Sequence, residues 1–253
     1  MIEQQNTIVV IPARLAAKRL PGKPLADIWG EPMIVHVWRR AMEAKIGHVL
    51  VAAGDLAIAD AIKTAGGDAI VTPANLPSGS DRVAAALKLR DPLARYSHVV
   101  NLQGDLPTID PLSVQRCLAG LTNDSVDIST IAAEIRETAD VANPNIVKAI
   151  APLSSIAGKD REVAFARDFV RHVTDEHQPP FWHHIGVYAY RREALDRFVA
   201  LPPSAREQER GLEQMRALDN GMKIAVVRVD EAPLGVDSPA DLEAARIALK
   251  DKS

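Results

Sequence analysis

The first half of the chain alternates short apolar runs with amphipathic stretches. The apolar runs predict β-strands over Thr7–Ala13, His48–Ala53, Asp68–Thr72 and His98–Gln103. The stretches between them predict helices over Met33–Ala44, Leu56–Ala65 and Ser80–Leu89. This βαβα order implies an α/β fold with a mostly parallel central sheet, helices on both faces and short crossovers. Ligands bind such sheets beyond the carboxyl ends of the strands, so the loops after Pro12 and Gln103 are expected to face one crevice.

The second half of the chain is less regular. Strands are predicted over Asp127–Ile135 and Ile146–Ala151, and in the segments HHIGVYAYRR and KIAVVRV. The segment SAREQERGLEQMRALDNG predicts one amphipathic helix that Gly221 ends. The segment DSPADLEAARIAL predicts a last helix, with Ser238 at the N-cap and Pro239 at the first helical position. Residues 158–178 are polar and charged. We expect a single domain over residues 1–253, with a smaller lobe inserted or appended over about residues 135–215.

Composition narrows the class of protein. A length of 253 residues and a hydrophobic content of 47% suffice for one large α/β domain, and an aromatic content of only 4% predicts an aliphatic core. The formal net charge of -3 argues against a role in coating nucleic acid. Cys117 is the only cysteine, which excludes an internal disulfide and a cysteine-based zinc site. No basic segment followed by an apolar stretch opens the chain, and no run reaches the roughly 20 apolar residues of a membrane span, so we expect a cytoplasmic protein without membrane insertion.

A basic loop follows the first predicted strand. It carries Arg14, Lys18, Arg19 and Lys23 among proline and glycine residues that stiffen it. Facing an anion, each charge-assisted contact contributes roughly 1.5–3 kcal/mol. The loop matches neither the Walker pattern nor the dinucleotide-binding pattern. A solvated basic turn is the plain alternative, but the position after the first strand favours a polyphosphate site.

Two aspartates are candidate metal ligands. In HVVNLQGDLPTIDP, Asp105 follows a strand and a glycine turn, where a carboxylate suits Mg2+; an ordinary turn before Pro107 is the alternative. In APLGVDSPADLE, Asp237 precedes a helix that Ser238 already caps. That second carboxylate is therefore either a helix-dipole partner or a metal ligand.

A third candidate is the helix start in LPSGSDRV. Its N-terminal amides can receive an anion or a polar base edge, and Ser80 and Arg82 lie in the first turn. A positive charge is unfavourable there, so a bound partner and a plain surface arginine both remain possible readings. The seven histidines form no zinc-protease pattern and no G-x-S-x-G motif occurs, which gives hydrolase chemistry little support.

Together these elements resemble the 3-deoxy-manno-octulosonate cytidylyltransferase family, from Ile8 to about Leu249. The resemblance is carried, in order, by IPARLAAKRLPGKPL, PSGSDR, NLQGDLP, NPNIVKA, HHIGVYAYR, LEQMRAL and GVDSPADLE. It implies a nucleotide-diphospho-sugar transferase-like fold, and transfer of CMP from CTP to the anomeric hydroxyl of the sugar acid 3-deoxy-manno-octulosonate (KDO). Pyrophosphate leaves, and the product serves lipopolysaccharide synthesis. It also implies a homodimer, Mg2+ as cofactor and no nucleic-acid partner.

The resemblance assigns roles by position. It implies a nucleotide site made of Arg14, Lys18, Arg19, Lys23, Ser80, Arg82 and Gln103. It implies Mg2+ on Asp105 and Asp237, which count as catalytic together with Arg19 and Lys23. It implies a sugar-acid pocket lined by Arg167, His184, Tyr188, Glu213 and Gln214. The guanidinium fork of Arg167 suits the substrate carboxylate.

Several positions depart from the family pattern. Leu106 replaces a usual glutamate, AAGDL around Gly54 replaces a Thr-Asp pair, and Ala166 replaces a serine. Lys18 stands where a small hydroxyl residue is usual. Two alternatives stay open: a cytidylyltransferase for a related acid such as 8-amino-KDO, and a non-catalytic nucleotide sensor.

Overall fold

This computed structural model describes residues 2–16, 19–155 and 162–250. Two compact units divide the chain: residues 1–115 with 233–253 form the first, and residues 116–232 the second. The lobe predicted over about residues 135–215 falls inside the second unit, which begins earlier, at Arg116, and ends later, at Ala232.

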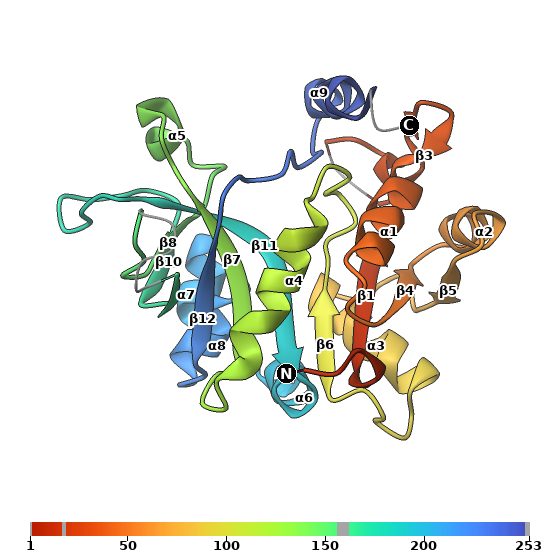
Figure 1. Cartoon of the computed structure of the whole chain (residues 1–253), viewed down its shortest axis with the longest axis horizontal. Coiled ribbons are helices and arrows are strands. Elements are labelled where there is room, and N and C mark those ends of the chain that lie inside the picture. The colour runs from red at the N-terminus through yellow and green to blue at the C-terminus, as the bar shows by residue number, and fades with distance from the viewer. Residues whose placement is uncertain (1, 17–18, 156–161, 251–253) are drawn as a thin grey trace. The chain divides into compact units, whose positions relative to one another are not determined.

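The first unit carries the predicted βαβα order (Figure 1). Its strands are β1 (Thr7–Ala13), β2 (Asp27–Ile28), β3 (Glu31–Pro32), β4 (His48–Ala53), β5 (Asp68–Val71) and β6 (His98–Asn101). Its helices are α1 (Met33–Glu43), α2 (Leu56–Thr64), α3 (Gly79–Arg90) and α9 (Pro239–Leu249). The predicted strands and helices of this half are confirmed, with ends that shift by two residues at most.

Four strands of the first unit pair in the order β5-β4-β1-β6, all parallel. The central strand, β1, is buried along its whole length, and Val9 pairs with Val49 on one side and Val100 on the other. Helices α1 and α3 both pack against β1 and β4. The predicted α/β class is confirmed. Because parallel strands end at one edge, the loops after β1 and β6 leave the sheet together.

The second unit mixes strand directions. Its strands are β7 (Ile128–Glu134), β8 (Lys148–Ile150), β9 (Val163–Phe165), β10 (Asp168–Val170), β11 (Trp182–Arg191) and β12 (Ile224–Val229). Its helices are α5 (Thr138–Ala142), α6 (Arg192–Ala200), α7 (Ala205–Arg210) and α8 (Met215–Asp219), while α4 (Pro111–Ala119) contains the boundary after Gln115. The order β11-β7-β12-β9 combines a parallel β7–β12 pair with antiparallel pairs on either side.

One expectation for this unit was wrong, and one segment had no predicted element. The segment predicted as one helix over residues 204–221 forms two, because Gly211 takes a left-handed φ of 63° that ends α7. A capping box formed by Ser204 and Glu207 marks the start of α7. The polar segment after residue 161 contributes the short strands β9 and β10, whose pairing with β12 and β8 the sequence pattern did not reveal.

Candidate active site

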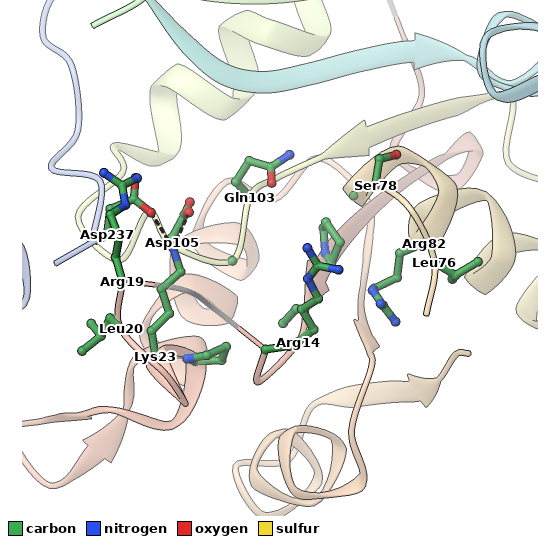
Figure 2. A pocket seen from close by; sticks show the side chains of 16 residues that line it. Arg14, Arg19, Leu20, Lys23, Leu76, Ser78, Arg82, Gln103, Asp105 and Asp237 are labelled. Atoms are coloured by element: carbon green, nitrogen blue, oxygen red, sulfur yellow. Dashed lines mark hydrogen bonds and ion pairs between the residues drawn. The ribbon is translucent and has the colours of Figure 1, made fainter. Parts of the chain in front are cut away.

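A cavity of about 420 Å³ lies in the first unit, at the carboxyl ends of β1 and β6 (Figure 2). Its walls include Arg14, Arg19, Lys23, Ser78, Gly79, Arg82, Gln103, Gly104, Asp105 and Asp237. In Figure 2, Arg19, Lys23, Asp105 and Asp237 gather at one end, and Arg14, Ser78 and Arg82 lie at the other. The single crevice expected from the strand order is therefore present, and it collects residues from four separate segments of the chain.

Lys23 joins the two aspartates at the first end of the pocket. Its Nζ donates to Asp105 Oδ2 at 2.9 Å, to Asp237 Oδ1 at 2.9 Å and to the Val236 carbonyl oxygen at 2.8 Å. Burial disfavours the charged amine, but the charges and hydrogen bonds of the two carboxylates outweigh it and raise the pKa of Lys23. The ammonium is therefore held firmly charged between two carboxylates.

Local backbone structure puts Lys23 in this position. Gly22 takes a left-handed φ of 71°, and its amide donates to the Leu15 carbonyl oxygen at 3.0 Å, which closes the basic loop. A short 3-10 turn over Lys23–Leu25 follows, with buried Pro24 at its second position. The turn fixes the backbone from which the Lys23 side chain extends.

Asp237 is aimed into the pocket by the start of α9. Ser238 caps the helix, as the sequence predicts, and it also forms a capping box with Asp241. Asp241 also accepts the backbone amide of Asp237 at 3.1 Å. One residue earlier, the Val236 amide donates to the Asp105 carbonyl oxygen at 2.9 Å, and the Val236 side chain is buried in an apolar cluster with Leu242. With the capping role filled, the Asp237 carboxylate is left to face cations.

Arg19 completes this end of the pocket. Its guanidinium donates to Asp237 Oδ2 at 2.7 Å, but both side chains are at least half exposed. An exposed pair of this kind adds little to stability. Breaking this ion pair therefore costs little free energy, so Arg19 can exchange Asp237 for another anion. The neighbouring candidate Lys18 lies outside the described residues.

The other end of the pocket is built around Arg82. This guanidinium is buried and donates to Thr72 Oγ1 at 2.6 Å, to the Pro73 carbonyl oxygen at 3.0 Å and to the Ala74 carbonyl oxygen at 3.2 Å. Burial, reinforced by the charge of Arg14, lowers the pKa of Arg82. The positive charge in the first turn of α3, unexplained from sequence, is anchored by the loop that leads into that helix.

Gly54, a departure from the family pattern, leaves no room for a side chain between itself and the two arginines. A Cβ atom at this position would lie 2.9 Å from Nη1 of Arg82 and 3.1 Å from the Cβ atom of Arg14. The next residue, Asp55, accepts the Leu15 amide at 2.8 Å and fixes the start of the basic loop. From sequence, the AAGDL segment stands out only as a departure from the family pattern, and neither Gly54 nor Asp55 was among the predicted site residues.

The nucleotide candidates on α3 and β6 differ in exposure. Ser78 caps α3 by accepting the Asp81 amide at 3.1 Å, and it lines the pocket with Gly79. Ser80 is buried. The pocket is therefore lined by the two residues before it, Ser78 and Gly79, and not by Ser80. Gln103 lines the pocket and donates from Nε2 to Asn101 Oδ1 at 3.3 Å.

Four of the five sugar-acid candidates form a cluster in the second unit. His184 and Tyr188 lie on β11 with ring centroids 5.6 Å apart, on either side of an irregularity in the β11–β7 register. Burial raises the pKa of Tyr188, and the charges of Tyr190 and Glu213 raise it further. Gln214 is buried, and its Nε2 has no hydrogen-bond partner among the described residues. A buried unpaired amide of this kind is a donor that a ligand can satisfy.

Burial also sets the protonation of His184. It lowers the pKa of His184 to about 3, with a smaller contribution from His183. The ring nitrogen Nε2 lies 3.1 Å from Thr130 Oγ1, and the ring packs edge-on against Phe169 at 4.9 Å. His184 is thus neutral at physiological pH. The fifth candidate, Arg167, is exposed, and its side chain has no ion-pair partner in the part of the chain that the structure describes.

The oxygen atoms around Lys23 fit a hard divalent cation. The carboxylates of Asp105 and Asp237 and the Val236 carbonyl oxygen converge within hydrogen-bond distance of one Nζ atom. Mg2+ prefers oxygen ligands and typically uses one or two carboxylates together with water and substrate phosphates. No cluster of three or more histidine, cysteine, aspartate or glutamate side chains suited to a metal occurs among the described residues. Leu106, which replaces a usual glutamate, is buried.

Comparison with known proteins defines the class first. A family model described as Cytidylyltransferase matches residues 8–224. A solved structure of a CMP:2-keto-3-deoxy-manno-octonic acid synthetase complexed with CTP is 34% identical, with a TM-score of 0.86 over 98% of this chain and all of the other. A nucleotidyl transferase from Methanothermobacter thermautotroptrophicus, 13% identical over 98% of this chain and 99% of the other with a TM-score of 0.60, shares the fold alone. The protein is a nucleotidyltransferase of the cytidylyltransferase class.

Curated relatives give the family within that class. The 3-deoxy-manno-octulosonate cytidylyltransferase of Parvibaculum lavamentivorans is 54% identical over 248 residues, which are 98% of this chain and 94% of the relative. The protein of the same name from Rhodospirillum centenum is 54% identical over 98% of this chain and 95% of its own length. The chain belongs to the 3-deoxy-manno-octulosonate cytidylyltransferase family. Within the described residues, no helix is long and apolar enough to cross a membrane.

Proposed function

We propose that this protein transfers CMP from CTP to the anomeric hydroxyl of KDO and releases pyrophosphate, as a step of lipopolysaccharide synthesis. One observation carries the proposal from the structure: Lys23 and Arg19 meet Asp105 and Asp237 at one end of a pocket large enough for a nucleotide. A triphosphate needs cations, a divalent ion needs carboxylates, and nucleotidyl transfer needs both together.

The basic loop binds the triphosphate in this account. Arg19 and Lys23 exchange their present carboxylate partners for phosphate oxygens and neutralise the departing pyrophosphate. Arg14 lies along the same wall, nearer the end where α3 begins. There Arg82, Gln103 and the start of α3 hold the cytidine. Because the displacement at the α-phosphorus is direct, no covalent intermediate with a side chain is required.

The proposal includes dependence on Mg2+, held by Asp105 and Asp237. When bound, such an ion neutralises phosphate charge and lowers the pKa of the attacking hydroxyl. The protein's part is to keep two carboxylates close together on separate segments, which the Val236–Asp105 backbone hydrogen bond does.

The sugar acid is assigned to the second unit. Arg167, exposed and unpaired within the described residues, supplies a bidentate partner for the carboxylate. Neutral His184 and the buried amide of Gln214 supply fixed hydrogen-bonding groups for sugar hydroxyls, beside Tyr188 and Glu213. We further propose a homodimer in the cytoplasm, on the family resemblance alone.

A turnover assay tests this function. Purified protein is incubated with CTP, Mg2+ and one sugar acid at a time, and pyrophosphate release is measured. We expect release with KDO and much less with 8-amino-KDO or a nonulosonate. Release with another acid and none with KDO would refute the substrate. Tight CTP binding without turnover under any acid would indicate a nucleotide sensor instead.

A further inference from the structure

Lys23 is placed differently from the other cations of the basic loop. Its side chain is 16% exposed and forms ion pairs with both Asp105 and Asp237, whereas Arg19 is 62% exposed and, among the described residues, forms an ion pair with Asp237 only. The Nζ atom lies among three oxygen atoms at 2.8–2.9 Å, which belong to the two carboxylates and to the Val236 backbone. A single ammonium group therefore sits among the same oxygens that suit a divalent cation.

We propose that Lys23 is an internal counter-ion: it holds Asp105 and Asp237 together in the nucleotide-free protein and competes with a divalent cation for their oxygens. The inference rests on the proposed function in one respect, since it takes Mg2+ to bind these two aspartates. It adds that the nucleotide-free protein binds the metal ion weakly and that nucleotide binding strengthens metal binding.

The competition follows from charge. Two carboxylates brought together without a cation repel each other, and an ammonium between them removes that cost. A divalent cation that enters the same space must displace the ammonium or tolerate its repulsion. A triphosphate offers Lys23 a second set of anionic oxygens, so nucleotide binding releases the carboxylates to the metal. By linkage, the metal then strengthens nucleotide binding by the same factor.

The backbone contacts that position the two aspartates do not depend on the Lys23 side chain. The Val236 amide holds the Asp105 carbonyl oxygen at 2.9 Å, and Asp241 holds the Asp237 amide at 3.1 Å. Neither contact involves the lysine side chain. The exchange therefore requires only that the Lys23 side chain change rotamer, while the two carboxylates stay on fixed segments.

Manganese binding without nucleotide tests the proposal. Free Mn2+ is titrated by electron paramagnetic resonance into the wild type, Lys23→Met and a charge-matched control, Lys63→Met, on the exposed side of α2. We expect Lys23→Met to bind Mn2+ at least tenfold more tightly than the wild type, and the control to match the wild type. Equal or weaker binding by Lys23→Met would overturn the proposal.

Two further variants test whether the gain in Mn2+ binding arises at this site. The double variant Lys23→Met with Asp105→Asn should lose the gain; if the gain persists, the metal lies elsewhere and the proposal fails. Lys23→Gln, neutral but still a hydrogen-bond donor, replaces the methionine variant if circular dichroism shows the latter unfolded, and the same tenfold criterion applies. Pyrophosphate release by the wild type separates the two proposals. If the wild type is active and the variant binds Mn2+ no more tightly than the wild type, only the counter-ion role of Lys23 is refuted. If the wild type is inactive and the variant binds Mn2+ more tightly, only the proposed transferase activity is refuted.

Discussion

Lys23 and Asp237 are 214 positions apart in the chain, yet Nζ of the lysine lies 2.9 Å from Oδ1 of the aspartate. Asp105, from a third segment, contacts the same Nζ atom at 2.9 Å. The end of the pocket assigned to the triphosphate thus depends on three loops that meet at one edge of the sheet. Each loop can be tested separately.

Asp105→Asn removes one carboxylate charge and keeps the shape of the side chain. We expect turnover to fall about 100-fold or more, because the metal site loses half its charge. The far-ultraviolet circular dichroism spectrum should stay that of the wild type. Asp60→Asn, an exposed change on α2, is the matched control and should leave turnover unchanged. Near-normal turnover by Asp105→Asn would refute the metal assignment.

Asp241→Ala removes the acceptor of the Asp237 and Ser238 amides. Loss of such a cap costs about 1 kcal/mol of folding free energy. We expect that loss in denaturant titrations, together with reduced turnover because Asp237 is no longer fixed. Glu243→Ala, on an exposed position of the same helix, serves as control. Normal turnover by a destabilised Asp241→Ala would show that the cap does not position Asp237.

Gly54→Val tests the end of the pocket built on Arg82. The added Cβ atom would approach Nη1 of Arg82 to 2.9 Å and push the guanidinium off its three acceptors. We expect CTP binding to weaken about fivefold, which corresponds to about 1 kcal/mol, in a calorimetric titration. Ala57→Val, nearby and exposed, should bind CTP like the wild type; equal affinity in both variants would remove Arg82 from the nucleotide site.

Arg167→Ala addresses the sugar acid. We expect the KM for the sugar acid to rise at least tenfold, because a bidentate carboxylate partner is lost, with little change in CTP affinity. Lys223→Ala, which removes another exposed charge of the same unit, is the control. The opposite pattern, weaker CTP binding with an unchanged sugar-acid KM, would contradict the assignment.

His184 predicts a pH dependence of stability. Burial lowers the pKa of His184 to about 3 in the folded protein, whereas the unfolded chain titrates near the ordinary value of 6.5. As the pH falls from 6.5 toward 3, only the unfolded chain takes up this proton, so the free energy of unfolding decreases. The decrease from this residue reaches about 2 kcal/mol by pH 5.

Denaturant titrations at pH 7 and pH 5 check this expectation. In His184→Gln the difference between the two pH values should shrink by about that 2 kcal/mol, whereas exposed His172→Gln should behave like the wild type. An unchanged difference in His184→Gln would mean that His184 is solvated and titrates normally.

Much of the first unit could be predicted because its signals are local. The strand Thr7–Ala13 is an uninterrupted apolar run, and the cap at Ser238 with Pro239 marks the start of α9 to the residue. The meeting of the loops after β1 and β6 could also be anticipated, since loops at the carboxyl ends of parallel strands share one edge. The convergence of Asp105 with Asp237 was expected from the family resemblance alone.

Other features depend on contacts that no local pattern encodes. Gly211 divides a segment with continuous helical character, because a left-handed residue there ends α7. Arg82 looks like an unfavourable surface charge in the sequence, and only the folded chain shows the Thr72 hydroxyl and two carbonyl oxygens that anchor it. The pairing of Lys23 with both aspartates likewise joins segments too distant in the chain for spacing to relate them.

A crystal structure of the protein with CTP and Mg2+ tests the central claim most directly. The account predicts triphosphate oxygens on Arg19 and Lys23, and a metal ion within bonding distance of the Asp105 and Asp237 carboxylates. A nucleotide bound outside this pocket, or a metal ion that touches neither aspartate, would contradict it.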